Sequence, residues 1–205
     1  MNKKWIFLWI AACLLVSGQD LANAEKLSLH ASCGFSSPTS DSIKSGFETG
    51  FGFALAVNKK IAVSFNFGFW KSNVNEKPGQ LMEGSLTVTP FLATIQYSFL
   101  GNKKFIPYLL VGAGYVFSDF KIKNLITIPE VRISQKIDNG PALQAGLGSQ
   151  LLMLRRLSFF AEALYIYRKA EATTTISDLN FGLSEEKFTL NMSTFFVSLG
   201  IKYYL

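Results

Sequence analysis

Residues Phe47–Val57 read FETGFGFALAV, and this stretch decides the fold. Its odd-numbered positions hold mostly large apolar side chains, and its even-numbered positions hold mostly glycine and alanine. Alternation of this kind is the period-two pattern of a β-strand with two unlike faces. A soluble protein would bury the large side chains and cover the other face with polar groups, which glycine and alanine do not supply. The rest of the chain has to show which face is turned inward.

The same alternation occurs in eight segments, each close to the roughly 9–11 residues that a tilted strand needs to cross a bilayer. Short and long connections alternate between them, which is typical of an up-and-down antiparallel meander. With an even number of strands, both ends of the meander lie on the short-turn side and the outermost strands can pair. We predict strands at Leu27–Phe35, Phe47–Val57, Ile61–Trp70, Thr87–Phe99, Pro107–Phe117, Ala142–Met153, Leu157–Arg168 and Thr194–Leu205.

The two faces of these strands differ in size and charge. The bulky odd-numbered face carries no charged residue, whereas the even-numbered face combines small residues with a few polar ones. Because the interior of an eight-stranded barrel is only just wide enough for its side chains, the bulky face must point outward. Such an exterior would be one continuous apolar patch in water, but a bilayer requires it. The sequence therefore predicts an all-β fold, an eight-stranded antiparallel up-and-down transmembrane β-barrel.

A soluble lipocalin-like barrel is the competing architecture, and it would need a charged exterior that neither face provides. Aromatic residues near the strand ends also favour the membrane, because girdles of this kind lie at its two interfaces. A general preference of aromatic residues for strands is the alternative explanation. The expected girdles are Phe35, Phe47, Phe69, Trp70, Phe117 and Tyr167 on the long-loop side, and Phe99, Phe105, Phe159 and Tyr203 on the short-turn side.

The first residues have the features of a signal peptide. A basic start precedes the apolar run Trp5–Val16, and Ala22-Asn23-Ala24 forms a small-x-small cleavage site. We therefore expect residues 1–24 to be a cleaved leader and residues 25–205 to be the barrel domain. The alternatives are an uncleaved anchor, for which the apolar run is short of about 20 residues, and a lipoprotein acylated at Cys13.

Charge and cysteine content exclude several classes of protein. The formal net charge of +6 is modest, and the chain has no long basic run. Because the chain is also expected to be exported, nucleic acid is not an expected partner. Cys33 is the only cysteine after the leader, so no internal disulfide is possible. Beyond the leader no apolar run reaches about 18 residues, so the chain lacks a predicted spanning helix.

Several segments together resemble a known superfamily. TPFLATIQYSF (Thr89–Phe99) and IPYLLVGAGYVF (Ile106–Phe117), joined by a short turn, resemble the fourth and fifth strands of small bacterial outer-membrane barrels of the OmpW/OmpX-like superfamily. GPALQAGLG (Gly140–Gly148) followed by LSFFAEALYIY (Leu157–Tyr167) resembles the same proteins. The final FFVSLGIKYYL is similar to the terminal signal read by the barrel-assembly machinery, although it ends in leucine rather than in an aromatic residue.

The resemblance covers nearly the whole mature chain. It implies a location in the bacterial outer membrane, contact with outer-membrane lipids and lipopolysaccharide, and the barrel-assembly machinery as a partner during biogenesis. It is specific for architecture and not for function, because the superfamily includes channels and adhesins.

Polar side chains on the small-residue face are the candidate functional groups. Glu162 and Lys202 fall on neighbouring strands and can approach each other near the short-turn end, and buried charges are expected to be paired. These groups predict either a structural plug of ion pairs or a charged constriction that filters a narrow pore. The candidate lumen-lining residues are His30, Glu48, Gln96, Gln144, Glu162, Arg168 and Lys202.

Apolar residues also fall on the inward face. They predict either dry packing that blocks the lumen or a path for small apolar molecules, and the resemblance implies the second. These residues are Val88, Leu92, Leu110, Leu152, Phe160, Leu164, Ile166 and Phe196.

We expect no catalytic, cofactor-binding or metal site. Gly112 and Gly114 form a G-x-G, but a dinucleotide loop would need a third glycine where Phe117 stands. His30 is the only histidine, too few ligands for a metal. A lipid-modifying hydrolase would place its histidine at the lipid-exposed or outer rim, whereas His30 faces inward partway up the wall.

The leading hypothesis is an outer-membrane, porin-like channel for small or hydrophobic solutes. The alternative is a non-conducting barrel whose extracellular loops mediate adhesion or envelope interactions. Two long connections, Asp119–Pro141 and Lys169–Ser193, carry apolar residues and predict either strands above the membrane or a surface for a partner. The basic turns at Lys59-Lys60, Lys103-Lys104 and Arg155-Arg156 would meet anionic lipid headgroups or be solvated.

Overall fold

A computed structural model of the chain describes residues 27–75, 82–99, 104–123, 131–178 and 182–205. The leader predicted over residues 1–24 lies outside these ranges. Within them, no helix has the length and apolar character needed to cross a bilayer.

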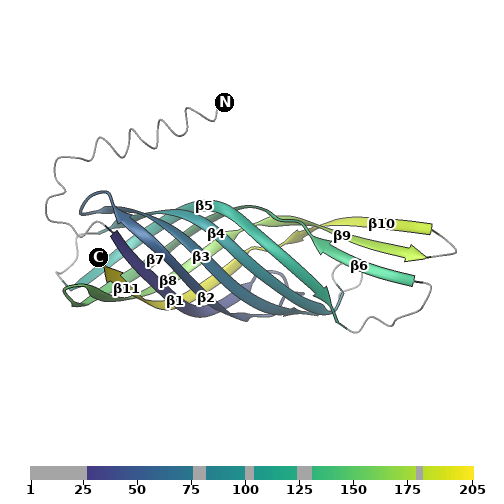
Figure 1. Ribbon diagram of the computed structural model, residues 1–205, viewed down its shortest axis with the longest axis horizontal. Helices are drawn as coiled ribbons and strands as arrows, with labels where there is room; N and C mark the ends of the chain where they lie inside the picture. Colours follow the sequence, from purple (N-terminus) through teal and green to yellow (C-terminus); the bar gives the residue numbers. More distant parts are fainter. Residues whose placement is uncertain (1–26, 76–81, 100–103, 124–130, 179–181) are drawn as a thin grey trace, which may run out of the picture.

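Eight strands close into an antiparallel barrel in the order β1-β11-β8-β7-β5-β4-β3-β2 (Figure 1). Because β1 pairs with both β2 and β11, the described strands leave no unpaired barrel edge. The predicted eight-stranded barrel is confirmed. The strands are β1 (Leu27–Pro38), β2 (Gly46–Ala56), β3 (Ile61–Val74), β4 (Gly84–Ser98), β5 (Phe105–Ile122), β7 (Gly140–Leu154), β8 (Leu157–Tyr167) and β11 (Thr194–Tyr204).

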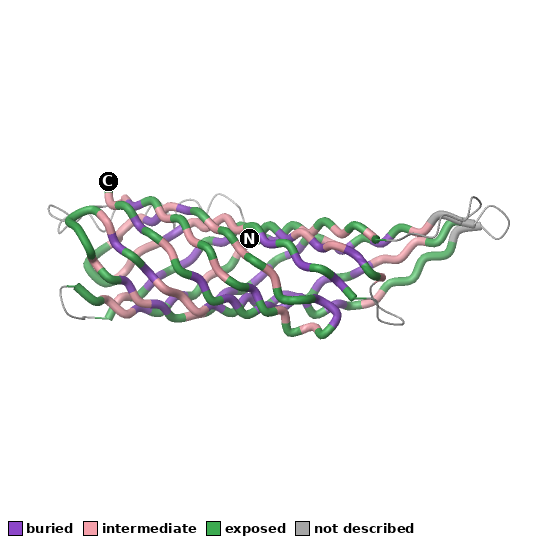
Figure 2. Tube along the Cα trace, turned by 90° about the horizontal axis from the view of Figure 1, so that it is seen from below, coloured by how far each residue is buried: buried purple, intermediate pink, exposed green. Residues whose placement is uncertain are grey.

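Large apolar side chains cover the outside of the barrel. Phe51 and Leu199 are each 64% exposed, whereas the neighbouring inward residue Ser198 is 4% exposed. Figure 2 shows this alternation of exposed and buried residues along the strands. The predicted orientation, with bulky residues outward and small or polar residues inward, is therefore correct.

The outer limit of the apolar surface is marked by a change of residue type along single strands. On β5 the exposed Phe117 is followed on the same face by exposed Asp119, and on β3 exposed Phe69 is followed by exposed Lys71. The other residues of both expected girdles are also exposed, with one exception. Trp70 is 3% exposed and points into the barrel, because it alternates with Phe69; its placement in the girdle was wrong.

A second sheet projects beyond the long-loop end of the barrel. The strands β6 (Val131–Ile137), β9 (Lys169–Asp178) and β10 (Gly182–Asn191) form it in the order β10-β9-β6 (Figures 1 and 2). These residues were predicted to be long connections. The sequence left two options open for them, strands above the membrane or a surface for a partner. The structure shows strands, which extend beyond the end of the barrel.

The outer half of the lumen is packed with apolar side chains. Trp70 and Phe196 are buried there, and the cluster continues through Ile137, Ala172 and Leu190 into the base of the projecting sheet. Six of the eight predicted inward apolar residues belong to this cluster and pack together; whether they block the lumen or form a path for apolar molecules stays a prediction. These six are Val88, Leu92, Leu110, Leu164, Ile166 and Phe196.

Glycines on the inward face make this packing possible. A Cβ added to Gly148 would lie 2.6 Å from the Tyr108 ring, and one added to Gly114 would collide with the carbonyl oxygen of Phe91. The inward face is therefore glycine-rich because strands and rings approach it closely.

The hydrogen-bonded ladder between β3 and β4 is interrupted at Pro90. Paired positions extend to Phe67↔Phe91 and resume in the same register at Trp70↔Val88. Proline has no N–H to donate to a neighbouring strand, which accounts for the interruption. Gly68 stands opposite, where an added Cβ would lie 2.9 Å from Pro90 Cγ.

Candidate functional site: a polar cavity in the lumen

A cavity of about 60 Å³ lies in the lumen below the apolar cluster. Six of the seven candidate lumen-lining residues border it, although they come from β1, β2, β4, β7, β8 and β11. Each occupies an inward position of its strand, and closure of the barrel brings these positions around one cavity. Their role as a filter or plug remains a prediction. The six are His30, Glu48, Gln96, Gln144, Glu162 and Lys202.

His30 belongs to a hydrogen-bond network across three strands. Its Nε2 lies 2.7 Å from Asn66 Oδ1, and Asn66 Nδ2 donates to Thr94 Oγ1 at 3.0 Å. Because an amide oxygen only accepts, the His30 Nε2 atom carries the hydrogen in this arrangement. The opposite ring atom, His30 Nδ1, is then an acceptor, and it is buried without a hydrogen-bond partner among the described residues.

Glu162 and Lys202 do not form the predicted ion pair. Glu162 lies opposite Ser198 in the β8–β11 register and Lys202 lies opposite Ser158, so the two are four residues apart along the ladder. Glu162 Oε1 instead accepts a 2.7 Å hydrogen bond from the Tyr108 hydroxyl. The only ion pairs within 4.0 Å in the described part of the chain are Lys121–Asp119 and Lys136–Asp138, both outside the lumen.

The amine of Lys202 lies against aromatic rings. Its Nζ is 5.9 Å from the centroid of the Tyr108 ring and 5.8 Å from that of Phe160, which are cation–π distances. Contact with two ring faces compensates only part of the hydration that a charged amine loses on burial.

Three buried polar atoms in residues lining the cavity lack hydrogen-bond partners in the described structure: Glu48 Oε2, Gln144 Oε1 and His30 Nδ1. All three can accept hydrogen bonds, so the cavity is polar and suited to hydration. No group of three or more His, Cys, Asp or Glu side chains close enough to hold a metal ion occurs in the described ranges.

The cavity reaches the barrel wall at the interruption beside Pro90. Its lining includes Pro90 and Gly68, and also Phe51 and Phe67, which belong to the outer face. Here the ladder of paired positions between the two strands of the wall is interrupted. Sequence reasoning missed this feature, for which a proline inside an otherwise continuous strand pattern was the available signal.

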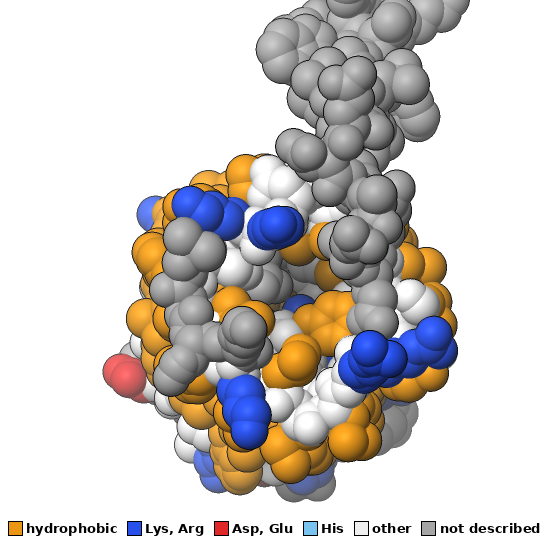
Figure 3. All heavy atoms as spheres, turned by 90° about the vertical axis from the view of Figure 1, so that its left-hand side faces the viewer, with side chains coloured by type: hydrophobic (Ala, Val, Ile, Leu, Met, Phe, Trp, Pro, Cys, Tyr) orange, Lys and Arg blue, Asp and Glu red, His pale blue; other side chains and the backbone are white. Residues whose placement is uncertain are grey.

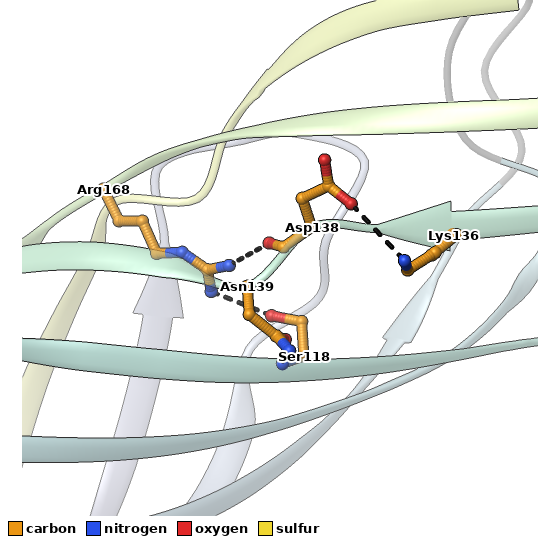
Figure 4. A network of polar contacts seen from close by, with 5 residues as sticks. All are labelled: Ser118, Lys136, Asp138, Asn139 and Arg168. Carbon is orange, nitrogen blue, oxygen red and sulfur yellow. Dashed lines mark hydrogen bonds and ion pairs between the residues drawn. The ribbon is translucent and has the colours of Figure 1, made fainter.

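Arg168, the seventh candidate, lies outside the cavity at the outer rim, directly after the girdle residue Tyr167. It is 2% exposed and donates hydrogen bonds to Ser118 Oγ at 2.8 Å and to the carbonyl oxygen of Asp138 (Figure 4). Burial lowers the pKa of Arg168 to about 10, so the guanidinium stays protonated at neutral pH. Arg168 thus ties the β8–β9 junction to β5 and to the β6–β7 connection.

Solved structures of bacterial outer-membrane proteins share this fold at low sequence identity. The outer membrane protein OprG from Pseudomonas aeruginosa is 17% identical with a TM-score of 0.69, over 87% of this chain and 96% of that one. Neisserial surface protein A is 13% identical with a TM-score of 0.59, over 87% and 97% of the two chains. The outer membrane protein AlkL, solved in lipid bilayers, is 20% identical with a TM-score of 0.53, over 90% and 93%.

The chain is a transmembrane β-barrel of the bacterial outer-membrane type. The apolar exterior of the closed barrel requires a bilayer, and the likeness to these solved structures shows the same fold. No family profile and no curated protein sequence matches the chain. Contacts with lipopolysaccharide and with the barrel-assembly machinery remain predictions.

Proposed function

We propose that this outer-membrane barrel passes small apolar solutes into the membrane rather than conducting ions. The observation that carries the proposal is the lumen cavity that reaches the wall where Pro90 interrupts the β3–β4 ladder. Pro90 and Gly68, which approach each other across the interruption, both line that cavity, so the wall beside it lacks a continuous row of interstrand pairs.

The interior above the cavity is apolar, which supports the choice of solute. From the base of the projecting sheet at Ile137 and Leu190, buried apolar side chains continue inward to Leu92 and Leu110. Leu92 and Leu110 also line the cavity. Transfer of an ion through such packing would cost several kcal/mol in lost hydration, whereas an apolar molecule can replace side-chain contacts as they move.

Substitution of Pro90 by alanine tests the proposal. P90A supplies the missing N–H, so the ladder can close and uptake of radiolabelled naphthalene by Gram-negative cells that make the protein should fall. Pro141 provides the matched control, because it is a strand proline on the exposed face of β7 and does not line the cavity. P141A should take up naphthalene at the unsubstituted rate.

Planar-bilayer recordings complete the test, with no stepwise ion conductance expected. Stepwise conductance, together with naphthalene uptake that P90A leaves unchanged, would contradict the proposal and indicate an aqueous pore. Uptake that is the same with and without the protein would favour the second candidate function.

The second candidate is an interaction barrel, favoured by the projecting sheet. β6 and β10 are its outer strands, and strand edges of this kind can pair with a strand of another protein. Replacing residues 124–136 and 171–190 by short turns should then abolish cell-to-cell aggregation, measured by sedimentation. Unchanged aggregation would exclude this role for the sheet.

A further inference from the structure

The short-turn mouth of the barrel contains a second pocket, distinct from the lumen cavity. Its volume is about 140 Å³, and it is enclosed by the inward faces of β1, β2, β3, β4, β5, β7 and β11 together with the β2–β3 turn. The pocket therefore has room for several water molecules or for one small polyatomic ion. In outer-membrane barrels the short turns face the periplasm.

The charge of this pocket has one sign. Lys59, Lys60 and Lys202 line it, and no carboxylate side chain does so among the described residues. Figure 3 looks onto this end and shows basic side chains on the rim around a hollow. Hydroxyl and amide groups complete the lining: Ser28, Asn58, Gln96, Ser98, Gln150 and Tyr204. Among them, Gln96 Nε2 donates to Ser98 Oγ and Gln150 Nε2 donates to the Tyr204 hydroxyl.

Lys202 provides an independent indication of a ligand. It is 7% exposed and lines both the mouth pocket and the lumen cavity. Glu162 attracts it through space, but no carboxylate oxygen lies within 4.0 Å of its Nζ in the described structure. A buried amine is costly unless an anion accompanies it. The aromatic rings beside Lys202 hold the side chain in place but cannot neutralise it.

From this geometry we infer that the mouth pocket is a periplasmic binding site for a small phosphate-bearing solute, with Lys202 at its base and Lys59 and Lys60 at its rim. A tetrahedral oxyanion can accept hydrogen bonds from several ammonium and hydroxyl donors at once. The site lies at the short-turn end and does not depend on passage of apolar solutes, which involves the Pro90 interruption and the outer half of the lumen, although Gln96 and Lys202 line both cavities.

Titration of the full mature chain with inorganic phosphate in maltoside micelles, followed by ³¹P NMR, tests the site. We expect saturable binding that K59Q/K60Q and K202M each weaken about tenfold or more. R155Q/R156Q is the matched control, because it removes two positive charges from another exposed turn that does not line the pocket. This control should change phosphate affinity less than about twofold.

The absence of saturable phosphate binding would overturn the inference. An equal loss of binding in K59Q/K60Q and R155Q/R156Q would also overturn it, because it would indicate general charge attraction. K59Q/K60Q changes only an exposed turn and therefore remains informative even if K202M fails to fold. Nanodiscs distinguish the source of the phosphate group. Loss of phosphate binding in phosphatidylglycerol nanodiscs, but not in phosphatidylcholine nanodiscs, would assign the pocket to a lipid headgroup and contradict a free solute.

Discussion

Trp70 and Phe196 meet edge to face inside the barrel, with ring centroids 4.9 Å apart and an interplanar angle of 68°. They come from β3 and β11, which are not neighbours in the barrel, so their contact spans the lumen. Both side chains are at most 3% exposed. This contact lies in the outer half of the lumen and joins two strands that are separated by β1 and β2.

Phe196→Ala should therefore destabilise the barrel by about 3–5 kcal/mol, because it opens a cavity in a packed interior. Reversible urea unfolding in lipid vesicles measures this free energy. Phe195→Ala is the control: Phe195 is the same residue type, one position earlier, and is 44% exposed to lipid. Lipid chains can fill the space it leaves, so its cost should be smaller, and equal costs would contradict the packed lumen.

Tyr108→Phe should destabilise the barrel by about 1–3 kcal/mol, because Glu162 loses its hydrogen-bond donor in a buried site. The same unfolding measurement applies. Tyr115→Phe, on the lipid-facing side of the same strand, should change stability by less than about 0.5 kcal/mol. If the two substitutions have the same effect, the Tyr108–Glu162 hydrogen bond is not stabilising.

The barrel was predictable because its signal is local and repeated. In FETGFGFALAV the alternation assigns each residue to one of two faces, and eight such segments fix the strand count. The projecting sheet gives no comparable signal. Glu171–Ser177 reads EATTTIS, in which neither face is clearly apolar, since in water one face packs only at its base and the other is solvated.

The candidate site was predictable in composition but not in pairing. Alternation correctly placed His30, Glu48 and Gln144 on one surface, and closure of the barrel brought them around one cavity. Which groups meet depends on register and side-chain length, which a single sequence does not show. The β8–β11 register separates Glu162 from Lys202 and leaves Glu162 within reach of Tyr108.

Gly114→Ala should destabilise the barrel by at least about 1–3 kcal/mol, since the added methyl group would collide with the backbone of Phe91 and the strands would have to move. Gly140 is the control, because a Cβ built there meets no atom within 4 Å. Gly140→Ala should be neutral or slightly stabilising. Urea midpoints of the two variants test the difference, and a tolerated Gly114→Ala would show that close strand contact does not require this glycine.

Arg168→Met should loosen the base of the projecting sheet while leaving the barrel intact. The substitution removes two charge-assisted hydrogen bonds, each worth about 1.5–3 kcal/mol. Limited proteolysis should then cut faster within residues 131–138 and 169–191, while the barrel strands stay protected. Arg156→Met, on an exposed short turn, should leave the pattern of fragments unchanged. An unaltered pattern for Arg168→Met would mean that the sheet is held by its apolar base alone.

The central claim, that the bulky face meets lipid and the small-residue face lines the lumen, is tested most directly at Cys33. Cys33 is exposed on β1, and Ser32 beside it lines the lumen cavity. A nitroxide is attached at Cys33 in a C13S chain reconstituted in bilayers, and at position 32 in an S32C/C33S/C13S chain. The label at Cys33 should collide readily with oxygen, which is soluble in lipid, and rarely with a water-soluble nickel complex. The label at position 32 should collide less often with oxygen than the label at Cys33 does. Greater access of the nickel complex to Cys33 than to position 32 would contradict the account.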